Sequence, residues 1–519
     1  MARFLTGWVA GLSVTLFSLA AAGAPLDTPP TARVAQGDLV GVLQGDVASF
    51  KNLPFAAPPV GGLRWKPPQA PAAWTGPRKA DAYGPACIQP TRPGQATSED
   101  CLSLNVWTPA KRAKGARLPV MVWIHGGAFV YGSGGTPFYD GSHFAQRGVV
   151  LVTLNYRLGR FGFFAHPALT AEDPKGSQGD YGFMDQIAAL KWVQANIAAF
   201  GGDKANVTVF GESAGAISVN YLLVSPLARG LFAKAISESG FARTPGRPIR
   251  GGENAAETVG VKVAAGLGVT GEGAQALAAL RALSAETLNT PPKGLQDPLG
   301  SGPIIDGVIA PVQVPAALQA GVVKVPVMLG GNSWEASLFP DIGKNPDATL
   351  ARAGPVKPRL LSLYGPDPSK AAVDVTTDLA VIEPNRFMAR QIVKAGRPAY
   401  VYYFSYLPAA VRSDQPGAPH GGEITYVFGN LPATPWTFLG LHVPAATADD
   451  RKISDAMIAY WVQFAKSGAP GNAGGPVWPA YGLAADPVME FGADGVQIRD
   501  HFEQVKLDFD EAITAFTPR

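Results

Sequence analysis

Several stretches of this chain are apolar at nearly every position, which is typical of strands buried on both faces of a sheet. Five of them lie at residues 120–124, 149–154, 207–210, 325–329 and 400–404. Before the third stretch, residues 184–200 carry apolar side chains at helical spacing. Strands that alternate with helices in this way predict an α/β fold with a large, mostly parallel central sheet and helices on both faces.

Other segments add to this pattern without interrupting it. Residues 39–43 and 47–50 flank Gln-Gly-Asp and predict a hairpin. Residues 251–288 are rich in Ala, Gly and Leu and predict a helical insertion, and residues 453–466 predict a closing amphipathic helix that ends at Gly468. We therefore expect residues 25–519 to form one catalytic domain.

The first residues have the pattern of an export signal. Arg3 precedes an apolar stretch at residues 4–19, and small residues follow at 20–24. We expect residues 1–24 to be a signal peptide with an approximate cleavage point, and the protein to be exported to the periplasm or beyond. A retained membrane anchor is the alternative, and no other run is long enough to span a bilayer.

Composition narrows the choice of partners. The chain has 519 residues, 16% of them charged, and a net charge of only +3. No basic tract interleaves with aromatic residues, which argues against a nucleic-acid partner. Its two cysteines, Cys87 and Cys101, should pair in an exported protein. Two thiols without a nearby pair of histidines do not complete a zinc site, so we expect no metal.

Residues 211–215 read Gly-Glu-Ser-Ala-Gly directly after an apolar strand. This is G-x-S-x-G between a strand and a helix, the pattern of a nucleophile elbow. The sharp turn needs small neighbours because the chain crowds itself there, and it would lift the hydroxyl of Ser213 above the sheet. Alone, a pattern with three fixed positions also occurs by chance.

A second glycine-rich segment supplies candidate donors for an oxyanion. Residues 123–129 read Trp-Ile-His-Gly-Gly-Ala-Phe, again after a buried strand. We expect the backbone N–H groups of Gly126, Gly127 and Ala214 to bind a developing negative charge.

The base must be a histidine that follows the serine and the acid along the chain. His420, His442 and His501 remain after this condition. His420 lies in a glycine-rich loop after a predicted strand and is favoured, whereas we expect His442 to be a packing residue and His501 a surface residue. More than a dozen carboxylates lie between Ser213 and His420. Glu335 is the best placed of them to act as the acid, because it lies just beyond a buried strand.

Taken together, these motifs resemble the type-B carboxylesterase family, a group of α/β-hydrolases related to cholinesterases. Residues 98–107 resemble its second signature and residues 210–216 its serine signature. Further blocks fall where the family has them, at residues 50–59, 155–157, 200–203 and 460–465.

The resemblance implies an α/β-hydrolase fold, a Ser213/Glu335/His420 triad and a disulfide between Cys87 and Cys101. The family usually has Asp-Glu-Gly around its acid, whereas this chain has Trp-Glu-Ala at residues 334–336. Glu212 and Ser239 match positions that line or buttress the site in relatives, although plain packing is an equal alternative.

We therefore expect a serine carboxylesterase that cleaves small-molecule esters through an acyl-enzyme without a cofactor. A partner-binding relative without catalysis, an amidase and a lipase are the alternatives. The loop at residues 88–100 lacks Trp, Tyr and Phe, which argues against choline esters. Five aromatic residues near the catalytic loops could line an apolar pocket or belong to the core or a lid: Phe129, Tyr131, Phe138, Tyr139 and Trp334.

Overall fold

The computed structural model describes residues 28–90, 94–176, 178–291, 302–342, 344–438 and 440–516. The expected signal peptide at residues 1–24 lies outside the described residues, so it stays a prediction. Within those described ranges, no helix combines the length and the apolar character needed to cross a membrane.

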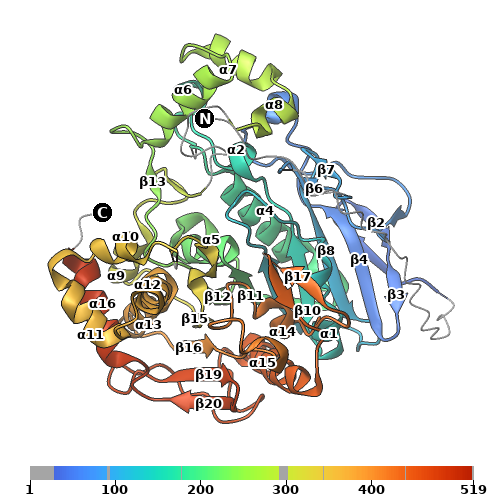
Figure 1. Ribbon diagram of the computed structural model, residues 1–519. Coiled ribbons are helices and arrows are strands. Elements are labelled where there is room, and N and C mark those ends of the chain that lie inside the picture. The colour runs from blue at the N-terminus through green and yellow to red at the C-terminus, as the bar shows by residue number, and fades with distance from the viewer. Residues whose placement is uncertain are drawn as a thin grey trace.

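An eleven-stranded sheet runs through the molecule (Figure 1). In order across the sheet, its strands are β20 (Gly495–Arg499), β19 (Val488–Gly492), β16 (Ala399–Phe404), β15 (Val327–Asn332), β12 (Lys234–Glu238), β11 (Gly202–Glu212), β9 (Leu118–Ile124), β10 (Val150–Leu154), β8 (Ser103–Pro109), β4 (Val47–Pro54) and β3 (Val42–Gln44). All strands from β19 to β10 are parallel, and antiparallel strands flank them at both ends. The predicted mostly parallel sheet is confirmed.

Helices pack on both faces of this sheet. One face carries α4 (Tyr181–Asn196), α5 (Ala214–Val224) and α13 (Glu383–Lys394), and the other carries α1 (Ser142–Gln146) and α15 (Ala448–Ser467). Alternate residues of β9 therefore enter different cores: Val122 packs in the core that contains Phe183, and Trp123 in the core that contains Trp461. Burial on both faces explains why these strands are apolar throughout.

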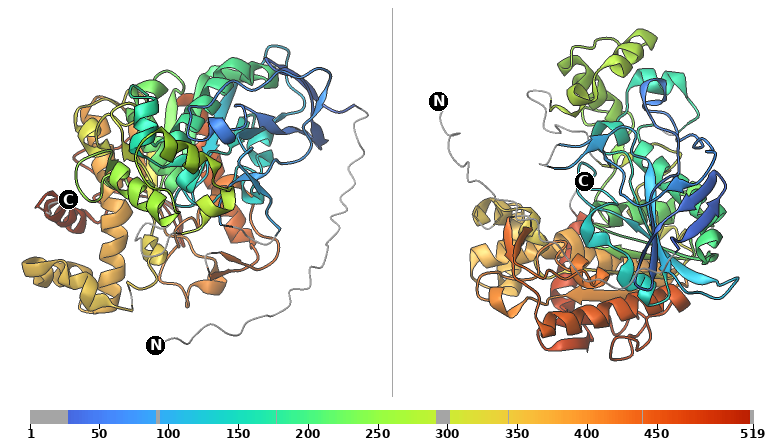
Figure 2. Two further views of the ribbon diagram at one scale, coloured as in Figure 1. Left: turned by 90° about the horizontal axis from the view of Figure 1, so that it is seen from above. Right: turned by 90° about the vertical axis from the view of Figure 1, so that its right-hand side faces the viewer.

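The other predicted segments are largely found. The insertion folds as α6 (Ala256–Gly266), α7 (Ala274–Ala282) and α8 (Ala285–Asn289) and stands at the top of Figure 1 and of the right view of Figure 2. The hairpin is formed by β3 and β4. Residues 453–466 lie in α15, which ends at Gly468 in a left-handed conformation with φ of 81°.

The expectation that this helix closes the fold is wrong. Strands β19 and β20 and the helix α16 (Gln504–Phe516) follow it. This end of the sheet could not be predicted from the sequence, because β20 is an edge strand with three exposed positions and lacks the apolar run of a central strand.

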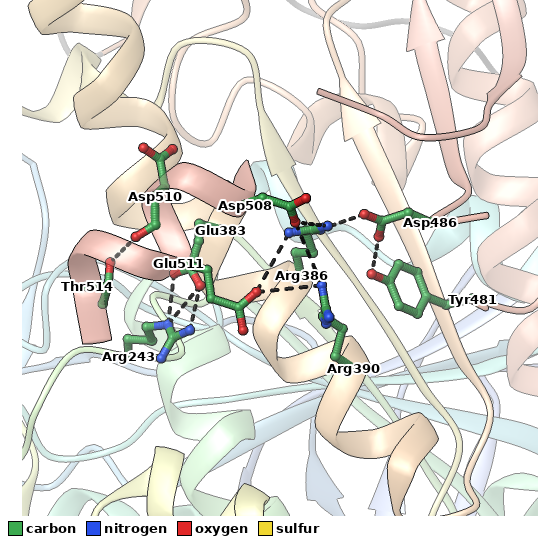
Figure 3. Close-up of polar contacts among 10 residues, drawn as sticks. All are labelled: Arg243, Glu383, Arg386, Arg390, Tyr481, Asp486, Asp508, Asp510, Glu511 and Thr514. Atoms are coloured by element: carbon green, nitrogen blue, oxygen red, sulfur yellow. Dashed lines mark hydrogen bonds and ion pairs between the residues drawn. The ribbon is translucent and has the colours of Figure 1, made fainter. Parts of the chain in front are cut away.

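Ion pairs hold α16 against α13, as Figure 3 shows. Nε of Arg386 on α13 lies 2.6 Å from Oδ2 of Asp486, and its Nη2 lies 2.7 Å from Oδ1 of Asp508 on α16. Because Arg386 is nearly buried, both carboxylates are needed to compensate its desolvation.

A second polar contact joins α16 to α11 (Lys357–Tyr364). The hydroxyl oxygen of Tyr364 lies 2.7 Å from Oδ2 of Asp378 and 2.6 Å from Oδ2 of Asp510. A phenol has one proton to donate, so two such contacts require that one carboxyl is itself protonated. Burial raises the pKa of Asp378 to about 7 and that of Asp510 to about 8, even though the Tyr364 hydrogen bonds act in the opposite direction.

These pKa values predict a pH-dependent stability. An aspartate with a pKa of about 8 when folded and about 4 when unfolded stabilises the fold fully below about pH 4 and loses that contribution as the pH rises through 8. Asp510→Asn should therefore flatten the decline in the free energy of unfolding between about pH 4 and pH 8, measured by denaturant titration. Asp494→Asn, at an exposed position, is the control. An equally steep decline in Asp510→Asn would contradict the raised pKa of Asp510.

Candidate active site

The predicted elbow forms where β11 ends and α5 begins. Ser213 lies between them with φ of 55° and ψ of −123°, a conformation that residues with a Cβ rarely adopt. A Cβ atom on Gly211 would lie 2.6 Å from the carbonyl oxygen of Ile124, and one on Gly215 would lie 2.0 Å from the same oxygen. Both glycines are therefore required by the close approach of β9, and the strained turn holds Ser213 at the edge of a cavity.

His420 and Glu335 form a buried pair. Nδ1 of His420 lies 2.5 Å from Oε2 of Glu335, and both residues are at most 4% exposed. Oε1 of Glu335 accepts hydrogen bonds from the backbone N–H of Asn332 at 2.7 Å and from the hydroxyl of Ser239 at 2.5 Å. Ser239, expected to buttress the site, thus contacts the carboxylate directly.

The loops that carry these two residues are joined by hydrogen bonds. The backbone N–H of Ala418 donates to Oγ of Ser333 at 2.8 Å, and that of His420 donates to Oγ of Ser337 at 2.9 Å. Neither serine was predicted to belong to the site. Their only signal was their position beside the candidate acid, directly after a buried strand.

The other ring nitrogen of His420 faces Glu212. Its Nε2 lies 3.0 Å from Oε1 of Glu212, yet within the described part of the chain neither atom has a hydrogen-bond partner. Burial lowers the pKa of His420, but the charges of Glu212 and Glu335 outweigh it and raise that pKa well above its usual value. Glu212, expected to line or buttress the site, is in direct contact with the candidate base. Ser213 lines the same cavity as both residues.

Two further carboxyl groups lie buried near the histidine and were not predicted. Glu423 accepts a hydrogen bond from Nδ2 of Asn332 at 2.5 Å, and Glu238 accepts one from Nε1 of Trp461 at 2.7 Å. Burial, reinforced by the charges of neighbouring carboxylates, raises the pKa of Glu423 to about 8 and also raises that of Glu238. Glu423 is therefore mostly protonated near neutral pH and adds little negative charge around His420, and the raised pKa of Glu238 acts in the same direction.

The expected oxyanion donors lie beside Ser213. Gly126, Gly127 and Ala214 all line its cavity, and a Cβ atom on Gly126 would lie 3.1 Å from the Cβ of Ser213. Across the described ranges, none of the three backbone N–H groups donates to a protein acceptor. They are thus available to a ligand, and Gly127 has φ of 102°, which suits glycine.

Further contacts hold the glycine-rich segment at residues 123–129 and the residues after it in place. His125 is buried, its Nδ1–H donates to the carbonyl of Gly126 at 2.8 Å, and burial lowers its pKa to about 4. Cys87 and Cys101 form the expected disulfide, and Gln89 in its loop exchanges two hydrogen bonds with the backbone of Gly132. The two hydrogen bonds of Gln89 hold the segment that follows the candidate oxyanion donors.

A cavity of about 1040 Å³ opens above Ser213. Four of the five expected aromatic residues line it, namely Phe129, Tyr131, Phe138 and Tyr139, whereas Trp334 is not among its lining residues. His442 also borders this cavity and is exposed, so the expectation of a packing residue is wrong. His501 is exposed as expected.

The contact between Glu212 and His420 predicts a shift in the pH dependence of activity. A histidine acts as a base only when neutral, so its raised pKa delays the rise of activity with pH. Glu212→Gln removes one negative charge and should move the acidic limb of kcat/KM to lower pH by about 1 unit. The measurement is hydrolysis of an activated ester over a pH series, with Glu286→Gln as an exposed control. An unmoved limb in Glu212→Gln would argue against the contact.

Comparisons with known proteins agree with this geometry. The profile of the carboxylesterase family matches residues 28–353 and 365–510. Fumonisin B1 esterase from Sphingopyxis macrogoltabida is 38% identical over 94% of this chain and 93% of its own length. Para-nitrobenzyl esterase from Bacillus subtilis is 37% identical over 86% and 91%. A solved carboxylesterase structure from Geobacillus stearothermophilus has a TM-score of 0.78, 32% identity, and coverage of 92% and 99%. The chain therefore belongs to the carboxylesterase family, the carboxylic ester hydrolases with an α/β-hydrolase fold.

Proposed function

We propose that Ser213, His420 and Glu335 are the catalytic triad of a serine carboxylesterase. One observation carries this proposal: a buried carboxylate holds Nδ1 of His420 at 2.5 Å, and His420 shares a cavity with a serine on a strained turn. A histidine oriented by a carboxylate and placed beside a hydroxyl is the arrangement that activates serine as a nucleophile.

In the proposed reaction, Oγ of Ser213 attacks the ester carbonyl carbon while His420 takes its proton. The N–H groups of Gly126, Gly127 and Ala214 bind the oxyanion of the tetrahedral intermediate. The intermediate collapses, the bond to the leaving oxygen breaks, and His420 gives its proton to the departing alcohol. Water then repeats the sequence on the acyl-enzyme and releases the carboxylic acid.

Electrostatics supports the same assignment of roles. The imidazolium that forms in each step lies between two carboxylates, Glu335 at Nδ1 and Glu212 near Nε2. Their charges stabilise the protonated ring and so favour the step that removes the serine proton. His125, in contrast, has a pKa lowered to about 4 and stays neutral, which suits a residue that only positions Gly126.

We also infer that the enzyme acts outside the cytoplasm. The export pattern of residues 1–24 motivates this inference, and the disulfide between Cys87 and Cys101 supports it, because such bonds persist in oxidising compartments.

Ser213→Ala tests the nucleophile. Removing the hydroxyl should lower kcat for p-nitrophenyl acetate by about 10⁴-fold or more, because the acyl-enzyme can no longer form. Thermal unfolding and the matched surface variant Ser362→Ala control for damage to the fold. An organophosphonate probe should label the unaltered enzyme on the peptide that contains Ser213 and should leave Ser213→Ala unlabelled. Substantial turnover or labelling in Ser213→Ala would refute the assignment.

A further inference from the structure

A small hairpin covers the cavity and is separate from the main sheet. Its strands β17 (Trp436–Phe438) and β18 (Leu441–Val443) pair antiparallel, with Trp436 opposite Val443 and Phe438 opposite Leu441. These four apolar side chains share one face because alternate residues of a strand point the same way. They are half-buried, whereas Thr437 and His442 on the other face are exposed.

The apolar face of this hairpin reaches the catalytic loops at two points. The ring of Trp436 lies 4.7 Å from that of Phe138, which follows the candidate oxyanion segment. A Cβ atom on Gly421 would lie 3.2 Å from Cζ of Phe438 and 3.4 Å from Oε1 of Glu212. The tip of Phe438 and the Glu212 carboxylate thus both approach Gly421, the residue that follows His420.

Hydrogen bonds fix the hairpin and its flanks in place. Nδ2 of Asn430 donates to the carbonyl groups of Phe138 and Asp140 at 2.8 and 2.9 Å. Nε2 of Gln415 donates to the carbonyl of His442 in β18 at 3.1 Å. The hairpin is thus a formed wall of the cavity and needs no folding step when a substrate enters, which lowers the entropic cost of binding.

Other residues that line the cavity are also apolar. The ring of Phe241 lies 5.8 Å from that of His420, and Leu338, Phe339, Tyr406 and Leu407 line the same cavity. The volume of about 1040 Å³ is at the upper end of the range of roughly 300–1,000 Å³ found for small-molecule sites. A carboxylic ester group fills only a small part of this space, so the remainder suits an apolar group attached to it.

We propose that Trp436 and Phe438 determine the specificity of this site, and that its substrates are esters with a long or bulky apolar group packed against the hairpin. This inference rests on the proposed function of Ser213. It assigns to the hairpin the binding of the non-reacting part of the substrate, whose burial raises kcat/KM in proportion to the apolar area removed from water.

The test uses two series of esters. One series runs from p-nitrophenyl acetate to the decanoate, and the other from ethyl to octyl acetate, so that the apolar group lies on either side of the ester bond. For the unaltered enzyme, kcat/KM should rise with chain length in at least one series. Phe438→Ala and Trp436→Ala should lower kcat/KM for the longest esters about tenfold more than for the shortest, mainly through KM. Phe438→Leu should restore part of the difference.

The control and the refuting outcomes are distinct. Gly440 lies in the turn of the hairpin with φ of 81° and open space around it, so Gly440→Asn should leave the length dependence unchanged. An equal loss of kcat/KM for short and long esters, or an unaltered length dependence in Phe438→Ala and Trp436→Ala, would refute the role of the hairpin. Neither outcome would bear on the proposed function. Failure of the unaltered enzyme to cleave any ester would refute the proposed function as well.

Discussion

The architecture of the site depends on the burial of one carboxylate, that of Glu335. A charged group without solvent is costly unless hydrogen-bond donors surround it. Here the donors are the hydroxyl of Ser239, the backbone N–H of Asn332 and the ring of His420. Ser239 follows β12, Asn332 ends β15, and His420 follows β16 along the chain, and these three strands are neighbours in the sheet. Parallel strands end at the same edge of the sheet. This strand order therefore brings together groups that are up to 181 positions apart along the chain.

The second feature is the balance of charge around His420. Two carboxylates flank its ring, and two more buried carboxyl groups, those of Glu423 and Glu238, have pKa values raised by burial and by their neighbours. If all four were ionised, they would repel one another in a region without solvent. With Glu423 mostly protonated and the pKa of Glu238 raised as well, the negative charge is concentrated on the pair that contacts the imidazole, where it would stabilise the imidazolium formed in the proposed reaction.

The sequence was sufficient for those parts of the site that depend on local geometry. The elbow around Ser213 was predictable because its glycines are demanded by contacts within a few residues and with one adjacent strand. Glu335 was different: its position after a strand made it only the best placed of many carboxylates, and the family resemblance was needed to favour it clearly. The direct contact of Glu212 with His420 joins residues 208 positions apart, and no periodicity along the chain encodes such a contact.

The hairpin of β17 and β18 escaped prediction for a related reason. Each strand has three residues, too short for an alternating pattern to be distinguished from loop, and its apolar face is only half-buried. His442 was assigned to packing because Leu, Val and Pro surround it along the chain. In a strand, however, alternate residues point to opposite faces, so apolar neighbours on both sides leave His442 on the exposed face.

Backbone strain around the cavity shows how firmly the fold holds this site. Ala128, Phe129, Ser213, Ser239 and Phe241 all have positive φ although none is glycine, and all five lie in segments that line or contact the candidate site. Each such residue costs of the order of 1–3 kcal/mol and persists only where the surroundings impose it. For Phe129 the cause is visible: its ring is buried and packs edge-on against Phe163 at 4.8 Å. Packing in the core thus fixes the backbone that presents the candidate oxyanion donors, so their orientation is set before any substrate arrives.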